Sequence, residues 1–141
     1  MTRDEIEAFF AARQAEWHAR NPQALAAAHA PDGIVVSPIF GELRGGPAIA
    51  DSYAELFRAF PDWDFTSQEL VVDGDRVAQH FTASATHEGD FMGLPGTHRQ
   101  AKVEGVRLYQ MKDGLIQCER RIYDFSALLI QIGVLRSKPG F

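Results

Sequence analysis

Apolar positions recur with helical spacing near the start of the chain. The stripe that they form, which includes one arginine, consists of Ile6, Phe9, Phe10, Arg13 and Trp17. Thr2 and Glu5 have the spacing of a capping box, so the pattern predicts a helix that ends at about Arg20. Asn21-Pro22 is a second start signal, an N-cap residue followed by proline in the first turn. The short helix that it begins should stop before Pro31.

Shorter apolar runs alternate with turn signals in the middle of the chain. Ile34 to Ser37 is a β-branched run that predicts a strand, and a glycine-bearing loop from Gly41 to Gly46 follows it. Pro47 then opens a third helix, which Pro61 ends. The apolar face of this helix comprises Ile49, Tyr53, Leu56, Phe57 and Phe60.

The second half of the chain has the pattern of an antiparallel sheet. Four strand-like segments cover Asp64 to Asp73, Arg76 to Glu88, His98 to Lys112 and Leu115 to Tyr123. Asp73-Gly74 and Asp113-Gly114 supply hairpin turns. A last helix from about Ser126 to Gln131 should end at Gly133.

Helices that precede a meander of strands predict one α+β domain over residues 1–141. We expect three N-terminal helices on one face of a strongly curved antiparallel sheet, with a short C-terminal helix. The loop from Gly89 to Gly96 interrupts two long strands, and its apolar side chains are costly to leave in water. We therefore predict that Phe91 and Met92 fold over a pocket mouth as part of a lid.

Composition narrows the classes of partner. Hydrophobic residues make up 45% of the 141 residues and charged residues 23%, so the chain can bury one sizeable core. The formal charge of −5 repels phosphate backbones, which argues against nucleic-acid binding. No apolar run approaches the roughly 18 residues of a membrane span, and the acidic N-terminus is unlike a secretory signal. The one cysteine allows no internal disulfide, so we expect a cytoplasmic protein.

The sequence motifs of several catalytic classes are missing. There is no glycine-rich phosphate loop, dinucleotide fingerprint or Gly-x-Ser-x-Gly elbow. The five histidines lack metal-ligand spacing, and Cys118 in a predicted strand is best explained as a small buried hydrophobe. We therefore expect no metal and no cofactor, and any catalysis should be acid/base chemistry by carboxylate, histidine or tyrosine.

The hairpin around Asp113-Gly114 can be placed in register by its charges. A two-residue loop would set Arg107 opposite Arg120, and like charges directly opposed destabilise a sheet. A three-residue loop from Lys112 to Gly114, with a glycine bulge, sets Arg107 opposite Glu119 instead. We predict this second register.

Strand alternation then suggests a candidate site on the last strand. With Ile122 facing the core, Arg120 and Asp124 share the inner face with Glu104 of the preceding strand and Cys118. Asp124 is the best catalytic candidate, because it lies where the strand meets the last helix. The alternatives are a buried ion pair without a role and, for Asp124, the N-cap of that helix.

Several segments, taken in order, resemble the SnoaL-like polyketide cyclase group within the nuclear transport factor 2-like superfamily. The resemblance covers nearly the whole chain. It rests on Asn21 to Asp32, Arg44-Gly45, Phe60-Pro61-Asp62-Trp63, Thr86 to Gly93, Asp113 to Ile116, Tyr123-Asp124 and Leu128 to Gly133. The sequence departs from the usual pattern at Cys118 and Arg120, where many relatives carry an acidic residue and an aromatic one.

The resemblance implies a cone-shaped α+β barrel and, if the chain is catalytic, a cofactor-independent cyclase or isomerase. The reaction implied is an intramolecular aldol closure of a bulky, apolar carbonyl compound. Asp124 occupies the position of the family acid/base, with His87, Glu104 and Arg120 as polar helpers. The residues expected to shape the substrate-binding wall are Trp17, Tyr53, Phe57, Trp63, Phe91 and Met92. If Arg120 contacts Asp124, a general base or a clamp for a substrate carboxylate is favoured over a general acid.

Two other functions fit the same fold. A limonene-type epoxide hydrolase needs an arginine between two carboxylates, for which Glu104, Arg120 and Asp124 have the right types. A non-catalytic protein would only bind a small molecule or dimerise. We expect a homodimer formed through the sheet, because Val103, Tyr109 and Tyr123 are predicted on its outer face.

Overall fold

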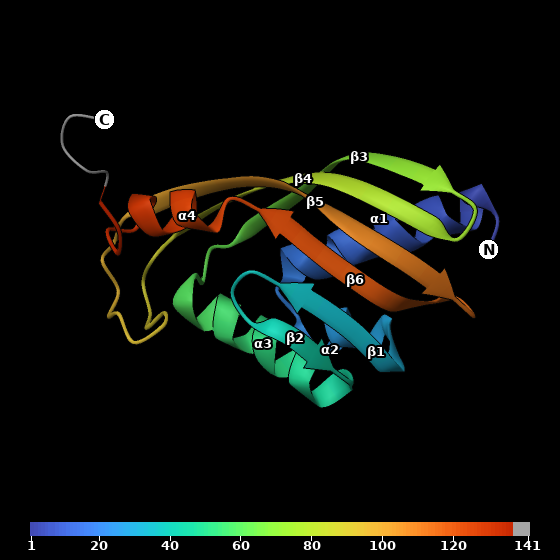
Figure 1. Cartoon of the computed structure of the whole chain (residues 1–141), viewed down its shortest axis with the longest axis horizontal. Helices are drawn as coiled ribbons and strands as arrows, with labels where there is room; N and C mark the ends of the chain where they lie inside the picture. Colours follow the sequence, from blue (N-terminus) through green and yellow to red (C-terminus); the bar gives the residue numbers. More distant parts are fainter. Residues whose placement is uncertain (137–141) are drawn as a thin grey trace.

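The computed structural model describes residues 1–136, which form four helices and six strands (Figure 1). The helices are α1 (Arg3–Ala19), α2 (Pro22–Ala27), α3 (Gly46–Ala59) and α4 (Phe125–Gln131). The strands are β1 (His29–Ser37), β2 (Gly41–Arg44), β3 (Asp64–Asp73), β4 (Arg76–Thr86), β5 (Gln100–Lys112) and β6 (Leu115–Tyr123). The predicted α+β fold is confirmed. No helix within residues 1–136 is long and apolar enough to span a membrane.

The predicted helix boundaries are confirmed, and side-chain caps mark the starts of α1, α2 and α4. The Thr2 hydroxyl accepts the Glu5 N–H at 3.1 Å, and the Glu5 carboxylate accepts the Thr2 N–H, which completes the capping box. Asn21 caps α2 through the Ala24 N–H. At the other end of the chain, Gly133 follows α4 with a φ of 89°, a conformation that glycine adopts easily.

The sheet has the order β2-β1-β6-β5-β4-β3, and all neighbouring strands are antiparallel except β1 and β6, which are parallel. The antiparallel meander from β3 to β6 is confirmed. The predicted loop at 41–46 is wrong in part, because Gly41–Arg44 forms β2. The strand expected from Ile34 begins at His29, and its register shifts between those two residues. Gly33 lies in this irregular stretch, where a Cβ atom would approach the Ala30 carbonyl oxygen to 2.9 Å.

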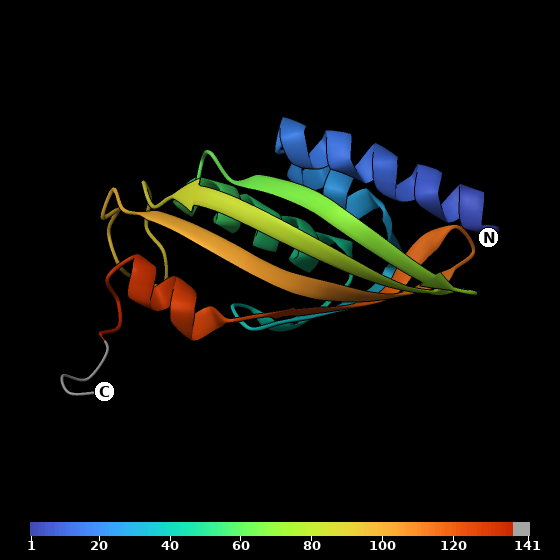
Figure 2. The same ribbon diagram turned by 90° about the horizontal axis from the view of Figure 1, so that it is seen from above.

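Helices α1, α2 and α3 cover one face of the bent sheet, while α4 extends from the end of β6 (Figure 2). Gly105 lies in the middle of β5, where a Cβ atom would come within 2.2 Å of the Ile122 carbonyl oxygen. Only glycine allows this close approach of β5 and β6. The core between helices and sheet has two apolar clusters, one around Trp17 and Phe65 and a smaller one around Phe10 and Met111.

The predicted register of the β5–β6 hairpin is wrong. Lys112 pairs with Leu115, which leaves a two-residue turn, and Gln110 pairs with Cys118 while Met111 pairs with Ile116. Gln117 is therefore the extra residue of a β-bulge. Its side-chain amide donates to the Asp32 carboxylate at 3.3 Å, in the irregular stretch of β1. The bulge thus lies beside an irregularity of the neighbouring strand.

This bulge inverts the alternation of every later residue on β6. Ile116 is buried as expected, but beyond Gln117 the side chains that face the helices are those of Glu119 and Arg121. The predicted inner face is therefore wrong. The residues that the prediction assigned to it are exposed to solvent: Glu104, Cys118, Arg120, Ile122 and Asp124.

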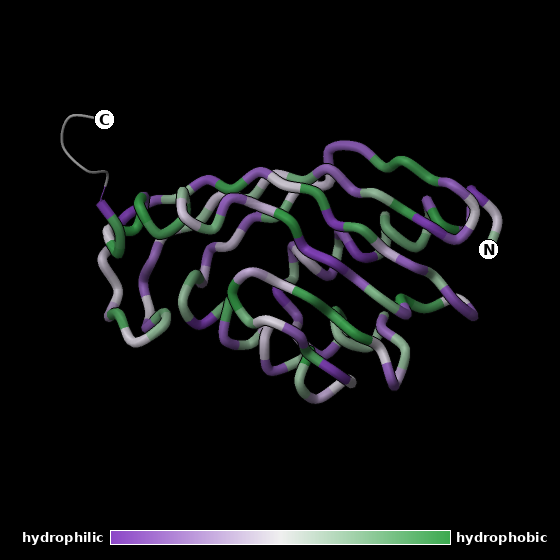
Figure 3. The backbone as a smooth tube through the Cα atoms, in the orientation of Figure 1, coloured by the Kyte–Doolittle hydropathy of each residue, from purple (hydrophilic) through white to green (hydrophobic). Residues whose placement is uncertain are grey.

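The outer face of the sheet also differs from the prediction, because the two-residue turn pairs Met111 with the buried Ile116 and so turns the odd-numbered residues of β5 inward. Val103 and Tyr109 are buried on the inner face, with 7% and 3% of their surface exposed, and Tyr123 is half-buried there. The apolar side chains that do lie exposed on the sheet are Val71, Leu108 and Ile122. Apolar and polar residues alternate along these strands (Figure 3). An open groove of about 540 Å³ runs over this face.

Candidate functional site

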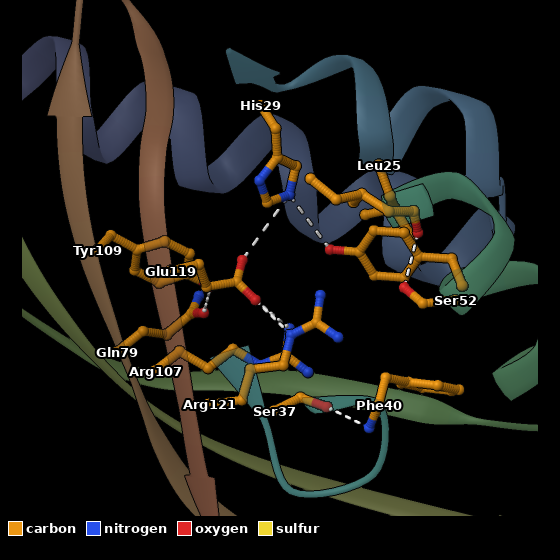
Figure 4. A network of polar contacts seen from close by, with 12 residues as sticks. Leu25, His29, Ser37, Phe40, Ser52, Gln79, Arg107, Tyr109, Glu119 and Arg121 are labelled. Carbon is orange, nitrogen blue, oxygen red and sulfur yellow. Dashed lines mark hydrogen bonds and ion pairs between the residues drawn. The ribbon is translucent and has the colours of Figure 1, made fainter. Parts of the chain in front are cut away.

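A buried carboxylate between two guanidiniums forms the centre of the polar interior (Figure 4). The Glu119 carboxylate accepts from Arg121 through a short contact to the arginine Nε, and from Arg107 Nη1 at 3.4 Å. Arg107 pairs directly with Arg121 across β5 and β6, so their like charges face each other with Glu119 Oε2 accepting from both. The attraction predicted between Arg107 and Glu119 exists, although the two residues are not directly opposite.

A second set of contacts joins this centre to the helices. His29 Nε2 lies 3.8 Å from Glu119 Oε1 and 3.5 Å from the Tyr53 hydroxyl. The Arg13 guanidinium of α1 donates to the Tyr53 hydroxyl at 3.1 Å and to the Leu25 carbonyl at 3.0 Å. These contacts connect α1, α2, α3, β1 and β6 through polar groups within the core.

Aromatic rings surround the two strand arginines. The Arg107 guanidinium lies 4.8 to 5.0 Å from the ring centroids of Trp17, Phe65 and Phe81, and that of Arg121 lies 5.0 Å from the ring of Tyr53. Such cation–π contacts replace part of the hydration that a buried cation loses. Tyr109 completes the layer, because its hydroxyl donates to the Gln79 side chain at 2.8 Å.

The charges of the network set the ionisation of its members. Burial opposes the charged form of Glu119, but Arg121 and Arg107 outweigh it and hold the pKa of this carboxyl well below its usual range. Burial likewise opposes the charge on Arg121, yet Glu119 raises the pKa of its guanidinium. Burial lowers the pKa of His29 to about 3, so this imidazole is neutral at physiological pH. A carboxylate held in this way is a weak proton acceptor and serves chiefly to orient the arginines.

The arginine pair forms part of the wall of a small inner cavity. The cavity has a volume of about 20 Å³, room for about one water molecule. It is lined by Ser37, Ile39, Phe40, Leu56, Trp63, Phe81, Val103, Arg107, Arg121 and Tyr123. Burial raises the pKa of the Tyr123 hydroxyl, so this phenol remains protonated.

A larger outer cavity of about 340 Å³ lies beside the inner one. It is enclosed by α3, by the turn after β1 and by the loop that carries Phe91 and Met92. Ile39 and Phe40 line both cavities and therefore separate them. The Phe40 N–H donates to the Ser37 hydroxyl at 2.9 Å, which holds the turn against the mouth of the inner cavity.

The structure does not place the predicted polar residues in this interior. Asp124 is exposed and caps α4 by accepting the Ala127 N–H at 2.9 Å. Glu104 is exposed and hydrogen-bonds His80 at 2.7 Å, and Arg120 is exposed on the outer face. The arginine flanked by two carboxylates that an epoxide hydrolase requires is therefore not formed by these three residues. The buried arrangement has the opposite stoichiometry, with two arginines on one carboxylate.

The residues of the predicted lid divide between core and solvent. Phe91 is buried against Phe60 and His87, whereas Met92 is 66% exposed at the tip of the turn. His87 is fully buried, and its Nδ1 accepts the Thr97 N–H at 3.3 Å. His87 supports the loop from inside and does not line the inner cavity.

The residues predicted to shape the substrate-binding wall also fall into two groups, one at the inner cavity and one in the core. Trp63 lines the inner cavity, whereas Trp17 and Tyr53 are buried core residues beside the arginines. Phe57 is partly buried and packs against Trp17. Tyr53 and Phe57 thus pack with Trp17 in the larger apolar cluster of the core.

Sequence reasoning did not bring the residues of this network together in the interior. Arg13 gave a usable signal, because an arginine stood within the apolar stripe of the first helix. The attraction between Arg107 and Glu119 was predicted, but the bulge at Gln117 reverses the face that simple alternation assigns to Glu119 and Arg121. Within residues 1–136, no group of three or more His, Cys, Asp or Glu residues is placed to hold a metal ion.

Comparison with known proteins identifies the family. Residues 9–132 match the family model for SnoaL-like polyketide cyclase. The chain therefore belongs to the SnoaL-like polyketide cyclase family, as the resemblance of its motifs predicted. No curated protein is similar enough in sequence to count as a match.

Solved structures share the fold. AclR from Streptomyces galilaeus, provisionally assigned as a hydroxylase, is 24% identical with a TM-score of 0.84, over 99% of this chain and 87% of AclR. A provisionally assigned SnoaL-like polyketide cyclase from Jannaschia sp. CCS1 is 18% identical with a TM-score of 0.85, over 96% and 98% of the two chains. IdmH from Streptomyces antibioticus, provisionally a polyketide cyclase, is 26% identical with a TM-score of 0.75, over 91% and 98%.

The neutral state of His29 predicts how stability depends on pH. The unfolded chain takes up a proton near the usual histidine pKa of 6.5, whereas the folded chain resists protonation until about pH 3. The unfolded state therefore binds more protons in this window, and the free energy of unfolding should fall as the pH is lowered from about 6.5. Denaturant titrations between pH 7.5 and about pH 5.5 measure this slope, because in this window the glutamate side chains of the unfolded chain, whose usual pKa is 4.5, remain almost fully ionised.

The His29→Asn variant provides the comparison. It should be less stable than the parent at pH 7.5, because it loses the contacts with Tyr53 and Glu119, but its stability should fall less steeply below pH 6.5. A variant with the same slope as the parent would show that His29 is not the group that resists protonation.

Proposed function

We propose that the chain is a cofactor-independent cyclase or isomerase that acts on a bulky, apolar carbonyl compound in its interior. The observation that carries the proposal is the position of Arg107 and Arg121, two buried guanidiniums in the wall of an otherwise largely apolar cavity. Membership of the SnoaL-like family supports the reaction class. Such an arrangement suits a reaction in which negative charge develops on an oxygen atom away from water.

An intramolecular aldol closure needs three actions. A proton leaves the carbon beside a carbonyl, that carbon forms a bond with a second carbonyl carbon, and the resulting alkoxide takes up a proton. Arg107 and Arg121 would stabilise the enolate oxygen, so that a proton between two carbonyls is acidic enough to leave to water at the mouth. The protonated Tyr123 hydroxyl would supply the proton to the alkoxide, and the resulting phenolate would take a proton back from the water that received the one lost from carbon. The aromatic walls would fold the substrate and exclude water.

The sequence prediction for Asp124 gives the competing assignment. Under that assignment Asp124 transfers the proton, although its carboxylate caps α4 and is exposed. The exposure of Asp124 also favours a second candidate function, a binding protein without catalysis. Turnover measurements on matched variants separate these three accounts.

The experiment uses a linear aryl 1,3,5-triketone and follows ring closure by liquid chromatography and mass spectrometry. We expect Arg121→Gln to lower the turnover rate by about 10²–10³-fold, the usual effect of removing one donor to a developing oxyanion. Tyr123→Phe should reduce turnover while leaving the fold intact. The exposed Arg44→Gln on β2 is the matched control and should turn over like the parent.

Asp124 variants complete the test. As a helix cap, Asp124→Asn should be nearly neutral and Asp124→Ala should lower the free energy of unfolding by about 1 kcal/mol. A loss of turnover by about 10²–10⁴-fold in a stable Asp124→Asn protein would instead assign the proton transfer to Asp124. Parental turnover by a folded Arg121→Gln protein would contradict our assignment. A parent protein that binds the triketone without closing it would support the binding protein.

The exposed apolar residues of the outer face support a homodimer through the sheet. Leu108 and Ile122 are 43% and 48% exposed, and the neighbouring groove carries both signs of charge, with Asp73 near Arg76 on one side and Arg120 on the other. A surface that pairs with its own copy across a two-fold axis needs such self-complementarity. We propose that a second copy of the chain covers this face.

Light scattering at micromolar concentration tests the dimer. The parent should have about twice the chain mass of 15.7 kDa, and Leu108→Asp should reduce it to the mass of one chain. Ile130→Asp, which alters an exposed apolar residue of α4, should leave the dimer intact. A parent protein with the mass of one chain would refute the proposal.

A further inference from the structure

The charges of the buried interior do not balance. Among the residues that the structure describes, the interior holds three arginines, Arg13, Arg107 and Arg121, and one acidic side chain, Glu119. Arg13 is satisfied by two neutral acceptors, the Leu25 carbonyl and the Tyr53 hydroxyl. Glu119 is shared by the other two arginines, so this pair retains an excess positive charge. Burying charge of one sign lowers the stability of the folded protein unless a counter-charge or hydrogen bonds replace the lost hydration.

Three buried N–H donors lack a partner beside the same cavity. In the described part of the chain, Arg107 Nε, Arg121 Nη2 and Trp63 Nε1 make no hydrogen bond. All three side chains are at least nine-tenths buried, with 3%, 7% and 5% exposed, and all three line the inner cavity. An unsatisfied buried donor is rare in a folded protein. Three around one cavity indicate a site for a group that accepts several hydrogen bonds.

The surroundings of these donors limit the shape of that group. Phe40, Phe81 and Tyr123 contribute aromatic rings to the cavity wall. The inner cavity alone holds about one water molecule, but the outer cavity of about 340 Å³ begins on the other side of Ile39 and Phe40. The inner cavity therefore takes about one acceptor oxygen, and a flat body that carries it would reach the outer cavity only if Ile39 and Phe40, which separate the two, moved aside.

We propose that this site binds an aromatic anion, whose carboxylate or ionised hydroxyl accepts from the unpaired donors Arg107 Nε, Arg121 Nη2 and Trp63 Nε1. The planar guanidinium groups suit two-point recognition of a carboxylate. This inference deepens the proposed function, since it assumes that the inner cavity is the substrate site, and it specifies a substrate that is charged before it reacts. Glu119 acts as a positioning residue, which holds both arginines and neutralises only one of them.

A comparison of two ligands tests the charge of the substrate class without altering the protein. Calorimetry measures the binding of 2-naphthoate, a flat carboxylate, and of 2-naphthamide, its neutral counterpart of the same shape. We expect the parent protein to bind 2-naphthoate at least about tenfold more tightly, as hydrogen bonds to a charged group imply. Equal affinities, or tighter binding of the amide, would overturn the proposal.

Two adjacent arginines on opposite faces of β6 locate the site. Arg121→Gln should remove the preference for 2-naphthoate over the amide, whereas Arg120→Gln should retain it, since Arg120 is exposed on the outer face. Circular dichroism tests whether each variant is folded. If Arg121→Gln does not fold, the conservative Arg121→Lys replaces it in the experiment and should keep part of the preference. Loss of the preference in Arg120→Gln alone would place binding on the outer face and refute the assignment.

The outcome is independent of turnover. If the parent prefers 2-naphthoate but closes no ring, the proposed reaction fails and the anion site stands. If it turns over the neutral triketone and shows no preference for the carboxylate, the reaction stands and the anion site fails.

Discussion

The contact between one carboxylate and two guanidiniums constrains both the fold and the site. Arg107 and Arg121 are directly paired on adjacent strands, an arrangement that repels unless an anion lies between them. Glu119 supplies that charge, and its other oxygen lies close to His29, which contacts Tyr53 on α3. The position of the helices over the sheet thus depends on the same groups that orient the arginines toward the cavity.

This polar layer lies between two apolar clusters of the core. Phe10 and Met111 belong to one cluster and Trp17 and Phe65 to the other, while Arg13 occupies the intervening position of α1. Buried ion pairs contribute little net stability compared with apolar packing, because each charge loses its hydration. A layer of this kind is therefore better explained by a requirement of the site than by a requirement of folding.

Local signals in the sequence were sufficient for most of the fold. The capping box at Thr2 and the turns at Asp73-Gly74 and Asp113-Gly114 depend on residues a few positions apart, and the structure confirms the helices and the hairpins that they predict. The parallel pairing of β1 with β6 has no local signal, since it joins segments some 85 positions apart, as the contact between Asp32 and Gln117 shows. The pattern of apolar and polar residues along the strands therefore did not predict that β1 and β6 are neighbours.

The prediction of which residues form the candidate site was wrong for one specific reason. The bulge at Gln117 lies beside the irregular stretch of β1 and is hydrogen-bonded to it through Asp32, a tertiary arrangement without a local sequence signature. Without the bulge, alternation from Ile116 turns Arg120 and Asp124 inward; with it, Glu119 and Arg121 face the helices. The chemical types expected in the interior, an arginine with a carboxylate, were correct, but one inserted residue exchanged the side chains that provide them.

The free energy of unfolding of Glu119→Gln tests most directly whether this carboxylate holds the arginine pair. The account predicts a loss of about 3 kcal/mol or more, because two buried guanidiniums are left facing each other without a counter-charge. The matched control is Glu104→Gln on β5, whose exposed carboxylate should change stability by no more than about 1 kcal/mol. A Glu119→Gln protein as stable as the Glu104→Gln control would contradict the account.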